Sequence, residues 1–227
     1  PRTGGILAMA VERGYDANRF PIVPKDRQRN RTVTDTYEPG STLKVVTVAG
    51  ALAEGLVSPT TQFTLAPKIQ VADRVIHEAH RTHTERMTVA SILAQSSNIG
   101  TITLAQLLGR ERLTSWLGKF GFGMKTGIDF PGETQGILPS YWSGSTIGTL
   151  PIGHGIAVTP VQMATAYAAV ANGGVWKEPH LVLSSRVKQR RVISRAVSEQ
   201  LMAMMRDVVL EGTGTEAAVE GYQVAGK

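Results

Sequence analysis

The chain has 227 residues, of which 42% are hydrophobic and 19% charged, and this balance is typical of a folded globular protein. It contains no run of about 18 apolar residues that could span a membrane, no signal-peptide pattern, and no cysteine for disulfides, thiolate chemistry or metal binding. The formal net charge is +6, but the basic stretches at residues 19–31 and 177–195 lack interleaved aromatic residues, so we expect solvated surface segments and no nucleic-acid partner.

The first third of the chain predicts one strand, one long loop and one helix. Residues 5–11 are short, apolar and led by glycine, which predicts a buried strand. Residues 12–40 are rich in Pro, Arg, Asn and Asp without periodicity, so we expect a long ordered loop. Apolar residues then recur at helical spacing from residue 45 to residue 56, and Gly55 and Pro59 end this predicted helix.

The remainder predicts mainly helices. Apolar faces at helical spacing run over residues 89–96, resume over 99–108, and continue over 113–120 before a glycine-rich stop. Thr159, Pro160 and Gln162 form a capping box with proline at the first helical position, and residues 172–174 end that helix. A last helix is predicted from about Ser198, and residues 222–227 look extended. No repeat or linker divides the chain, so we expect one domain over residues 1–227.

Ser41 and Lys44 are three positions apart at the start of the first predicted helix, which brings both side chains to one face. A serine hydroxyl becomes a good nucleophile only when a base removes its proton. Lysine can act as that base only when uncharged, so its pKa must fall from ~10.4 toward ~7–8, through burial and a neighbouring cation. Free backbone N–H groups at the helix start can stabilise an oxyanion. Alone, this spacing is also compatible with a capped surface helix.

Two other segments support the nucleophile interpretation. Ser96, Ser97 and Asn98 follow the apolar face of their predicted helix, so we expect Ser96 to point inward. The chain then ends at Lys227 after Val-Ala-Gly. Ser-x-x-Lys, a Ser-x-Asn element and a late Lys are parts of the motif set of penicillin-binding proteins and class A β-lactamases.

Nearly the whole chain resembles the transpeptidase domain of class B penicillin-binding proteins, particularly the division type. The similar segments are residues 30–44, 120–123, 126–133, 152–163 and 171–174. The resemblance implies an α+β fold of the penicillin-binding transpeptidase and serine β-lactamase type, with an antiparallel sheet flanked by helices. Because the chain stops where Lys-Thr-Gly begins, we expect a C-terminally incomplete domain that lacks its last strands, and a second polypeptide is a candidate for completing it.

The same resemblance implies a role for each candidate site residue. Ser41 would attack the D-alanyl-D-alanine carbonyl of a peptidoglycan stem peptide and form an acyl-enzyme, with Lys44 as its general base. Ser96 would relay a proton to the departing D-alanine, and Asn98 would bind the substrate's amide. Lys227 would tune Lys44 and attract the substrate carboxylate. The amine of a second stem peptide would then form the cross-link, and β-lactams would acylate Ser41 with very slow release.

Partners and location are also implied only by the resemblance. They are peptidoglycan stem peptides, β-lactams, and membrane proteins of cell division or elongation. The protein would lie on the extracytoplasmic face of the bacterial cytoplasmic membrane, anchored by an N-terminal helix upstream of this chain. No cofactor and no metal ion is implied.

Two alternative functions stay open at this point. A serine β-lactamase would share the chemistry of Ser41 and Lys44, but class A enzymes hydrolyse the acyl-enzyme with a water held by Glu-x-x-Leu-Asn. The string at residues 111–114 does not match that pattern. A β-lactam-sensing module without catalysis is the other alternative.

Three further patterns are interpreted as non-catalytic. Residues 125–127 spell Lys-Thr-Gly, but in a glycine-rich loop. His77, His80 and His83 are three apart, whereas a zinc protease needs His-Glu-x-x-His, so we expect a solvated loop. His154 is expected to be structural or to lie at the rim of the cleft, because Lys44 already supplies the base.

Overall fold

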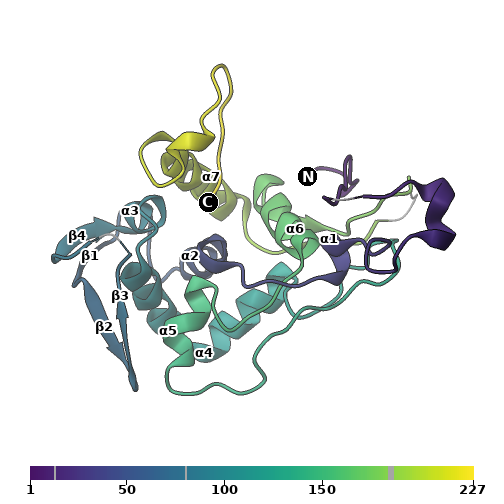
Figure 1. Ribbon diagram of the computed structural model, residues 1–227. Helices are drawn as coiled ribbons and strands as arrows, with labels where there is room; N and C mark the ends of the chain where they lie inside the picture. Colours follow the sequence, from purple (N-terminus) through teal and green to yellow (C-terminus); the bar gives the residue numbers. More distant parts are fainter. Residues whose placement is uncertain (13, 80, 184–186) are drawn as a thin grey trace.

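The computed structural model describes residues 1–12, 14–79, 81–183 and 187–227 (Figure 1). The helices are η1 (Ala17–Ile22), α1 (Arg31–Thr34), η2 (Gly40–Leu43), α2 (Lys44–Ala53), α3 (Val89–Ala94), α4 (Asn98–Phe120), α5 (Thr146–Thr149), η3 (Leu150–Ile152), α6 (Pro160–Ala171), α7 (Arg195–Leu210) and η4 (Thr215–Ala217). The strands are β1 (Gln62–Leu65), β2 (Lys68–Val71), β3 (Arg74–His77), β4 (Glu85–Thr88), β5 (Val175–Lys177) and β6 (Gln189–Arg191).

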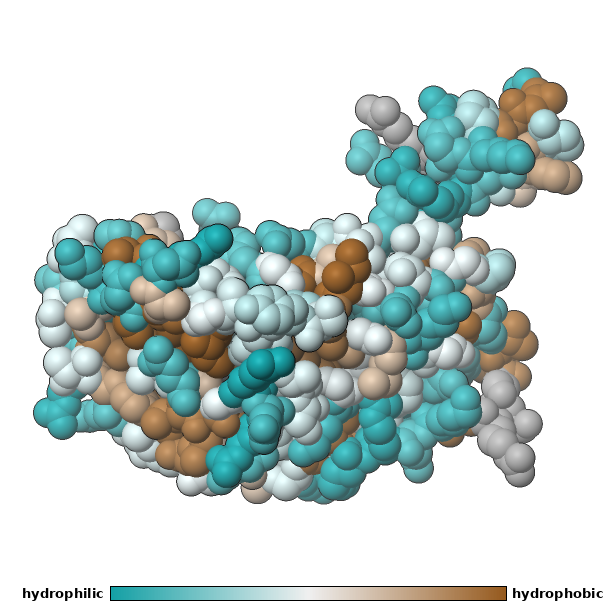
Figure 2. Space-filling view, turned by 90° about the horizontal axis from the view of Figure 1, so that it is seen from below, coloured by the Kyte–Doolittle hydropathy of each residue, from teal (hydrophilic) through white to brown (hydrophobic). Residues whose placement is uncertain are grey.

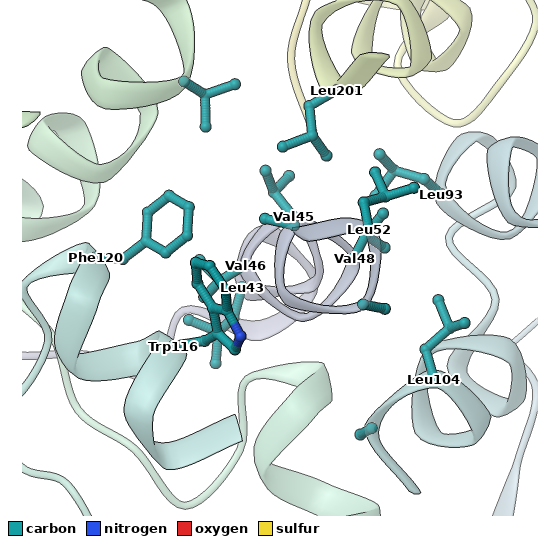
Figure 3. Close-up of a cluster of buried hydrophobic side chains, with 14 of the residues drawn as sticks. Leu43, Val45, Val46, Val48, Leu52, Leu93, Leu104, Trp116, Phe120 and Leu201 are labelled. Carbon is teal, nitrogen blue, oxygen red and sulfur yellow. The ribbon is translucent and has the colours of Figure 1, made fainter. Parts of the chain in front are cut away.

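Helix α2 lies in the middle of the molecule, in contact with α3, α4 and α7 (Figure 1). Every residue of α2 except Ala53 is buried, as expected for a helix that is apolar on all sides. Figure 3 shows Val45, Val48 and Leu52 of this helix among side chains from its neighbours, including Leu93 and Leu201.

One glycine makes the tight packing of α2 against α4 possible. A Cβ added to Gly50 would lie only 2.9 Å from the Trp116 ring of α4. The large apolar side chains of α4 therefore pack directly on the backbone of α2, and burial of such rings is a major contribution to core stability. This contact joins the second half of α2 to α4.

The strands form three antiparallel pairs, β1–β4, β2–β3 and β5–β6, so that the structure combines helices with antiparallel strands as expected. The first two pairs form an excursion between α2 and α3, at the left of Figure 1. In the β2–β3 pair, Lys68 lies opposite His77. At the end of β3, His77 O and the Glu78 side chain accept hydrogen bonds from Asn98 at the N-terminus of α4.

The predicted helix boundaries agree with the structure where a capping motif marks them. Thr159 accepts a hydrogen bond from Gln162 N, and the Gln162 side chain accepts one from Thr159 N, which confirms the capping box of α6. Helix α7 begins three residues earlier than predicted, because Ser194 is its N-cap. Ser198 is instead a buried residue of the helix that donates a hydrogen bond to Val170 O.

The prediction of a strand at residues 5–11 is wrong. Only Gly5 pairs with another segment, in an isolated parallel bridge to His180, and Leu7 is fully exposed. A strand requires a partner along its length, and no such ladder forms here among the described residues. The predicted loop at residues 12–40 contains two short helices, η1 and α1.

The segment around η1 projects from the rest of the molecule and is largely hydrophilic (Figures 1 and 2). Most residues between 14 and 30 are exposed, which agrees with the prediction of a solvated basic segment at residues 19–31. Helix α4 joins two of the predicted helices through Gly109, whose φ is +75°. In the part of the chain that the structure describes, no helix combines the length and the apolar character needed to cross a membrane.

Candidate active site

Ser41 lies in the short helix η2, immediately before α2, and is exposed. Two contacts fix the backbone around it. Gly40 N donates a hydrogen bond to Gly153 O at 3.1 Å, and Tyr167 Oη of α6 donates one to Thr42 O at 2.9 Å. The nucleophile candidate is therefore presented to solvent on a turn that is held from both sides.

Lys44 is the first residue of α2, and its side chain is completely buried although the residue is a lysine. Its Nζ atom donates hydrogen bonds to Ser96 O at 2.6 Å, to Asn98 Oδ1 at 2.7 Å, and to Ser96 Oγ at 3.2 Å. Among the described residues, the hydrogen bonds of Nζ go to Ser96 and Asn98, and none goes to the Ser41 hydroxyl. The amine thus points into the protein, toward the second predicted site segment.

Burial is the main reason why the pKa of Lys44 falls to about 7. The positive charge of Lys227 lowers this pKa further, whereas the negative charge of Glu78 raises it. A lysine with a pKa near 7 is about half uncharged at neutral pH, which is the state required of a general base. The structure therefore gives Lys44 the protonation behaviour that the sequence argument required.

Ser96 lies in a turn between α3 and α4 and has a left-handed backbone conformation with φ +57°. The prediction that Ser96 continues the apolar face of a helix is therefore wrong, because α3 already ends at Ala94. A left-handed serine costs roughly 1–2 kcal/mol. This conformation brings both its carbonyl and its hydroxyl to Lys44, so Ser96 still points inward.

Asn98 is the first residue of α4 and connects three segments. Its Oδ1 accepts the hydrogen bond from Lys44, and its Nδ2 donates to His77 O at 3.2 Å. Ser97 forms the N-cap of α4, since its Oγ accepts a hydrogen bond from Gly100 N at 2.9 Å. The amide orientation of Asn98 is consequently determined by the strand excursion as well as by α4.

Lys227 is half-buried, and burial lowers its pKa. Its Nζ donates a hydrogen bond to Thr213 Oγ1 at 3.2 Å, and its charge acts on Lys44. Thr213 N in turn donates to Ala94 O at 3.1 Å, which connects the loop after α7 to the end of α3. The sequence analysis did not identify Thr213, because nothing local in the sequence distinguishes it.

Glu78 is the second residue that the sequence analysis missed. The sequence predicts a solvated loop around His77, yet the neighbouring Glu78 side chain is only 5% exposed. It accepts hydrogen bonds from Asn98 N at 2.9 Å, from Ile99 N at 3.1 Å, and from the Ser97 hydroxyl. The solvated-loop prediction is therefore wrong for Glu78, because the carboxylate meets a helix N-terminus 20 residues further along the chain.

The structure also describes His154 and the internal Lys-Thr-Gly string, two patterns that the sequence analysis interprets as non-catalytic. No group of residues suited to hold a metal ion occurs among the described positions, and His80 lies outside them. His154 is exposed, and its Nδ1 lies 3.2 Å from a carboxylate oxygen of Glu38. Thr126 N donates to the side chain of Glu133 at 2.7 Å within the loop.

Comparison with known proteins gives a family that agrees with this geometry. The model of the penicillin binding protein transpeptidase domain matches residues 1–227. Penicillin-binding protein PbpB of Mycolicibacterium smegmatis is 38% identical, over all of this chain and 38% of its own length. Peptidoglycan D,D-transpeptidase FtsI of Escherichia coli K12 is 33% identical, over 98% of this chain and 38% of its own length. The chain thus spans about two fifths of these curated relatives.

Solved structures show the same fold. The crystal structure of penicillin binding protein 3 from Mycobacterium tuberculosis complexed with ampicillin superimposes with a TM-score of 0.84 at 34% identity, covering 90% of this chain and 51% of that one. The transpeptidase domain of penicillin-binding protein 3 from Burkholderia pseudomallei gives a TM-score of 0.84 at 28% identity, covering 99% of this chain and 65% of that one. The chain therefore belongs to the class B penicillin-binding proteins and has the α+β fold of their transpeptidase domain.

Proposed function

We propose that this protein is a peptidoglycan D,D-transpeptidase that cross-links stem peptides through an acyl-enzyme on Ser41. The observation that supports this proposal best is the fully buried Lys44, whose pKa is about 7 and whose amine is hydrogen-bonded to Ser96 and Asn98. A buried amine that is uncharged near neutral pH, one helical turn from an exposed serine, is the arrangement that serine acylation needs. The similarity to proteins described as D,D-transpeptidases supports the same reaction.

In the acylation step, the Ser41 hydroxyl oxygen forms a bond to the carbonyl carbon of the penultimate D-alanine. Its proton passes to the neutral amine of Lys44, which becomes an ammonium ion. The bond between this carbonyl carbon and the amide nitrogen of the terminal D-alanine then breaks. Ser96 Oγ, 3.2 Å from Lys44 Nζ, takes a proton from the ammonium ion and passes its own proton to that leaving nitrogen. Lys44 is neutral again when D-alanine departs.

Deacylation repeats these steps with the amine of a second stem peptide as nucleophile. The amine nitrogen forms a bond to the acyl carbon, and its proton passes through Ser96 to Lys44. The bond from Ser41 Oγ to the acyl carbon then breaks, and Lys44 returns the proton to Ser41 Oγ. A β-lactam enters the same first step, but its amide nitrogen stays attached to the acyl group after ring opening. The acyl-enzyme then persists. The relative whose crystal structure is complexed with ampicillin supports the proposal that this protein binds β-lactams.

Asn98 and Lys227 are assigned to substrate binding. Asn98 Nδ2 is a donor at the edge of the Ser96 turn and is suited to an amide of the stem peptide. Lys227 carries its ammonium group next to Thr213 and is suited to the terminal carboxylate of the substrate. Because stem peptides are cross-linked outside the cytoplasmic membrane, we place the protein on the extracytoplasmic face with division or elongation proteins as partners.

The two alternatives differ from this proposal in the fate of the acyl-enzyme. A class A β-lactamase needs a glutamate that activates water, but Glu111 is exposed on α4, and Glu78 is engaged by donors from the start of that helix. Neither side chain is available as such a base. A sensor would form the acyl-enzyme without cross-linking peptides, so it is separated from the enzyme by experiment.

The test is labelling with a fluorescent penicillin, followed by denaturing electrophoresis. We expect a label on Ser41 that is stable for hours, no label on Ser41→Ala, and wild-type labelling of Ser115→Ala, which changes an exposed serine of α4. Rapid loss of the label would support the β-lactamase instead. Cross-linking of stem-peptide mimics is expected as well, and its absence with a stable label would support the sensor.

A further inference from the structure

The N-terminus of α4 carries backbone N–H groups that have no partner within the helix. Ser97 satisfies Gly100 N, as a helix N-cap does. Two of the preceding groups, those of Asn98 and Ile99, donate instead to the two carboxylate oxygens of Glu78. The same carboxylate accepts the Ser97 hydroxyl hydrogen bond. A single side chain from outside the helix therefore fixes the residues that carry the Ser-x-Asn element.

Burial of a carboxylate is unfavourable unless its charge is compensated. Arg81 Nη2 lies 3.2 Å from Glu78 Oε1, and the side chain of Arg81 is itself only 11% exposed. Arg81 also donates a hydrogen bond to Leu65 O of β1 at 2.7 Å. The α4 N-terminus attracts a negative charge in addition. Glu78 is thus held in position from the strand excursion on one side and from the helix on the other.

The contacts continue from Glu78 to the reactive amine. Glu78 binds the backbone N–H of Asn98, while the neighbouring His77 carbonyl accepts from the side-chain amide of the same residue. With its nitrogen held in this way, Asn98 directs Oδ1 to Lys44 Nζ at 2.7 Å. Displacement of the Glu78 carboxylate would release both Asn98 and the neighbouring Ser96 turn.

We propose that Glu78 is a positioning residue of the active site, which holds Ser96 and Asn98 against the Lys44 amine through its contacts with the N-terminus of α4. This inference rests on the acyl-transfer function proposed above. Nothing in the mechanism requires Glu78 to touch substrate. Its effect is exerted through the orientation and the charge of Lys44.

The charges around this group decide how acylation should depend on pH. Lys44 faces the negative charge of Glu78 and the positive charge of Lys227. Glu78 faces Arg81. Both side chains line a cavity of about 280 Å³, together with His83 and Glu85. Since Glu78 favours the charged form of Lys44, loss of its charge should make the amine neutral at lower pH.

The test compares Glu78→Gln with Glu85→Gln in the full chain. Glu85 is a matched control, because it also pairs with Arg81 but is 47% exposed and has no contact with α4 among its described hydrogen bonds and ion pairs. We measure the second-order rate constant for acylation by a fluorescent penicillin across pH. For Glu78→Gln we expect the maximal rate to fall about ten-fold or more and the acid limb to move to lower pH. Glu85→Gln should match wild type in both respects.

A lower maximum with an unmoved acid limb would contradict the charge effect, and wild-type values of both would overturn the whole proposal. If Glu78→Gln does not fold, Glu78→Asp decides, because it keeps the charge but not the reach. Its acid limb should stay in place while the maximum falls. An unchanged maximum would contradict the positioning role.

An NMR titration of Lys44, by its 13Cε signal, separates this proposal from the proposed function. If wild type is not acylated at Ser41, the proposed function fails, and the titration still tests Glu78. A lower pKa of Lys44 in Glu78→Gln than in wild type and Glu85→Gln supports the role of Glu78. An equal pKa in all three proteins overturns the charge effect of Glu78 on Lys44.

Discussion

Lys44 Nζ lies 2.7 Å from Asn98 Oδ1, and this hydrogen bond joins the first residue of α2 to the first residue of α4 across 54 positions of the chain. The amine is buried because α2 is surrounded by α3, α4 and α7. It nevertheless retains polar partners, as any buried amine must. This arrangement favours the neutral amine without leaving it unsatisfied.

The first prediction concerns the pH dependence of acylation. Because the pKa of Lys44 is about 7, the rate constant for acylation should rise with pH through about 7 and then level off. The measurement is the rate of labelling by a fluorescent penicillin between pH 5 and 9. Lys44→Met should lose nearly all labelling at every pH. A flat profile in wild type would contradict the assignment of Lys44 as the base.

The second prediction concerns stability. The folded-state pKa of Lys44 lies below that of an unfolded lysine, so the unfolded chain binds more protons between about pH 7 and 10, and stability contributed by this site rises with pH there. The slope is at most about 1.4 kcal/mol per pH unit. Lys44→Met lacks this contribution. We therefore expect its free energy of unfolding to fall further below that of wild type as pH rises from 7 to 9. Denaturant titrations at several pH values measure this difference, and a constant difference would argue against it.

The third prediction concerns the contact between α6 and the nucleophile turn. Tyr167→Phe removes the hydrogen bond to Thr42 O and should lower the free energy of unfolding by about 1 kcal/mol. Acylation should also slow several-fold, because Thr42 directly follows Ser41. Tyr141→Phe is the control, since Tyr141 is 77% exposed. Thermal unfolding and labelling rates of both variants test this, and equal labelling rates would mean that the turn does not depend on Tyr167.

The fourth prediction concerns Gly153, whose φ is +86° and which packs against the backbone before Ser41. A Cβ at Gly153 would lie 2.0 Å from Gly40 O, so Gly153→Ala should displace the nucleophile turn and abolish most labelling. Gly155 has φ +75° but no atom within 4 Å of an added Cβ. Gly155→Ala should therefore cost only about 1 kcal/mol from its backbone conformation. Similar behaviour of the two variants would show that the contact with Gly40 is unimportant.

Predictions from local patterns agree best with the structure. The capping box of α6 and the helix that follows Ser41 depend on residues three or four positions apart, and such spacings appear directly in a sequence. The strand prediction at residues 5–11 failed because a strand depends on partners from elsewhere in the chain. Ser96 was placed on a helix face because an apolar pattern does not reveal the left-handed turn that ends α3.

The amino-acid sequence was enough to predict Ser41 and Lys44 as a nucleophile and its base, candidate roles for Ser96, Asn98 and Lys227, and the likeness of nearly the whole chain to one enzyme family, which comparison with known proteins confirms. Folding brings together what no local pattern shows: Lys44 is buried, its amine is bound to Ser96, and Glu78 and Thr213 lie nearby. The physical reason is that a pKa depends on burial and on charges brought close by folding. Such contacts join residues dozens of positions apart, and no spacing in the sequence records them.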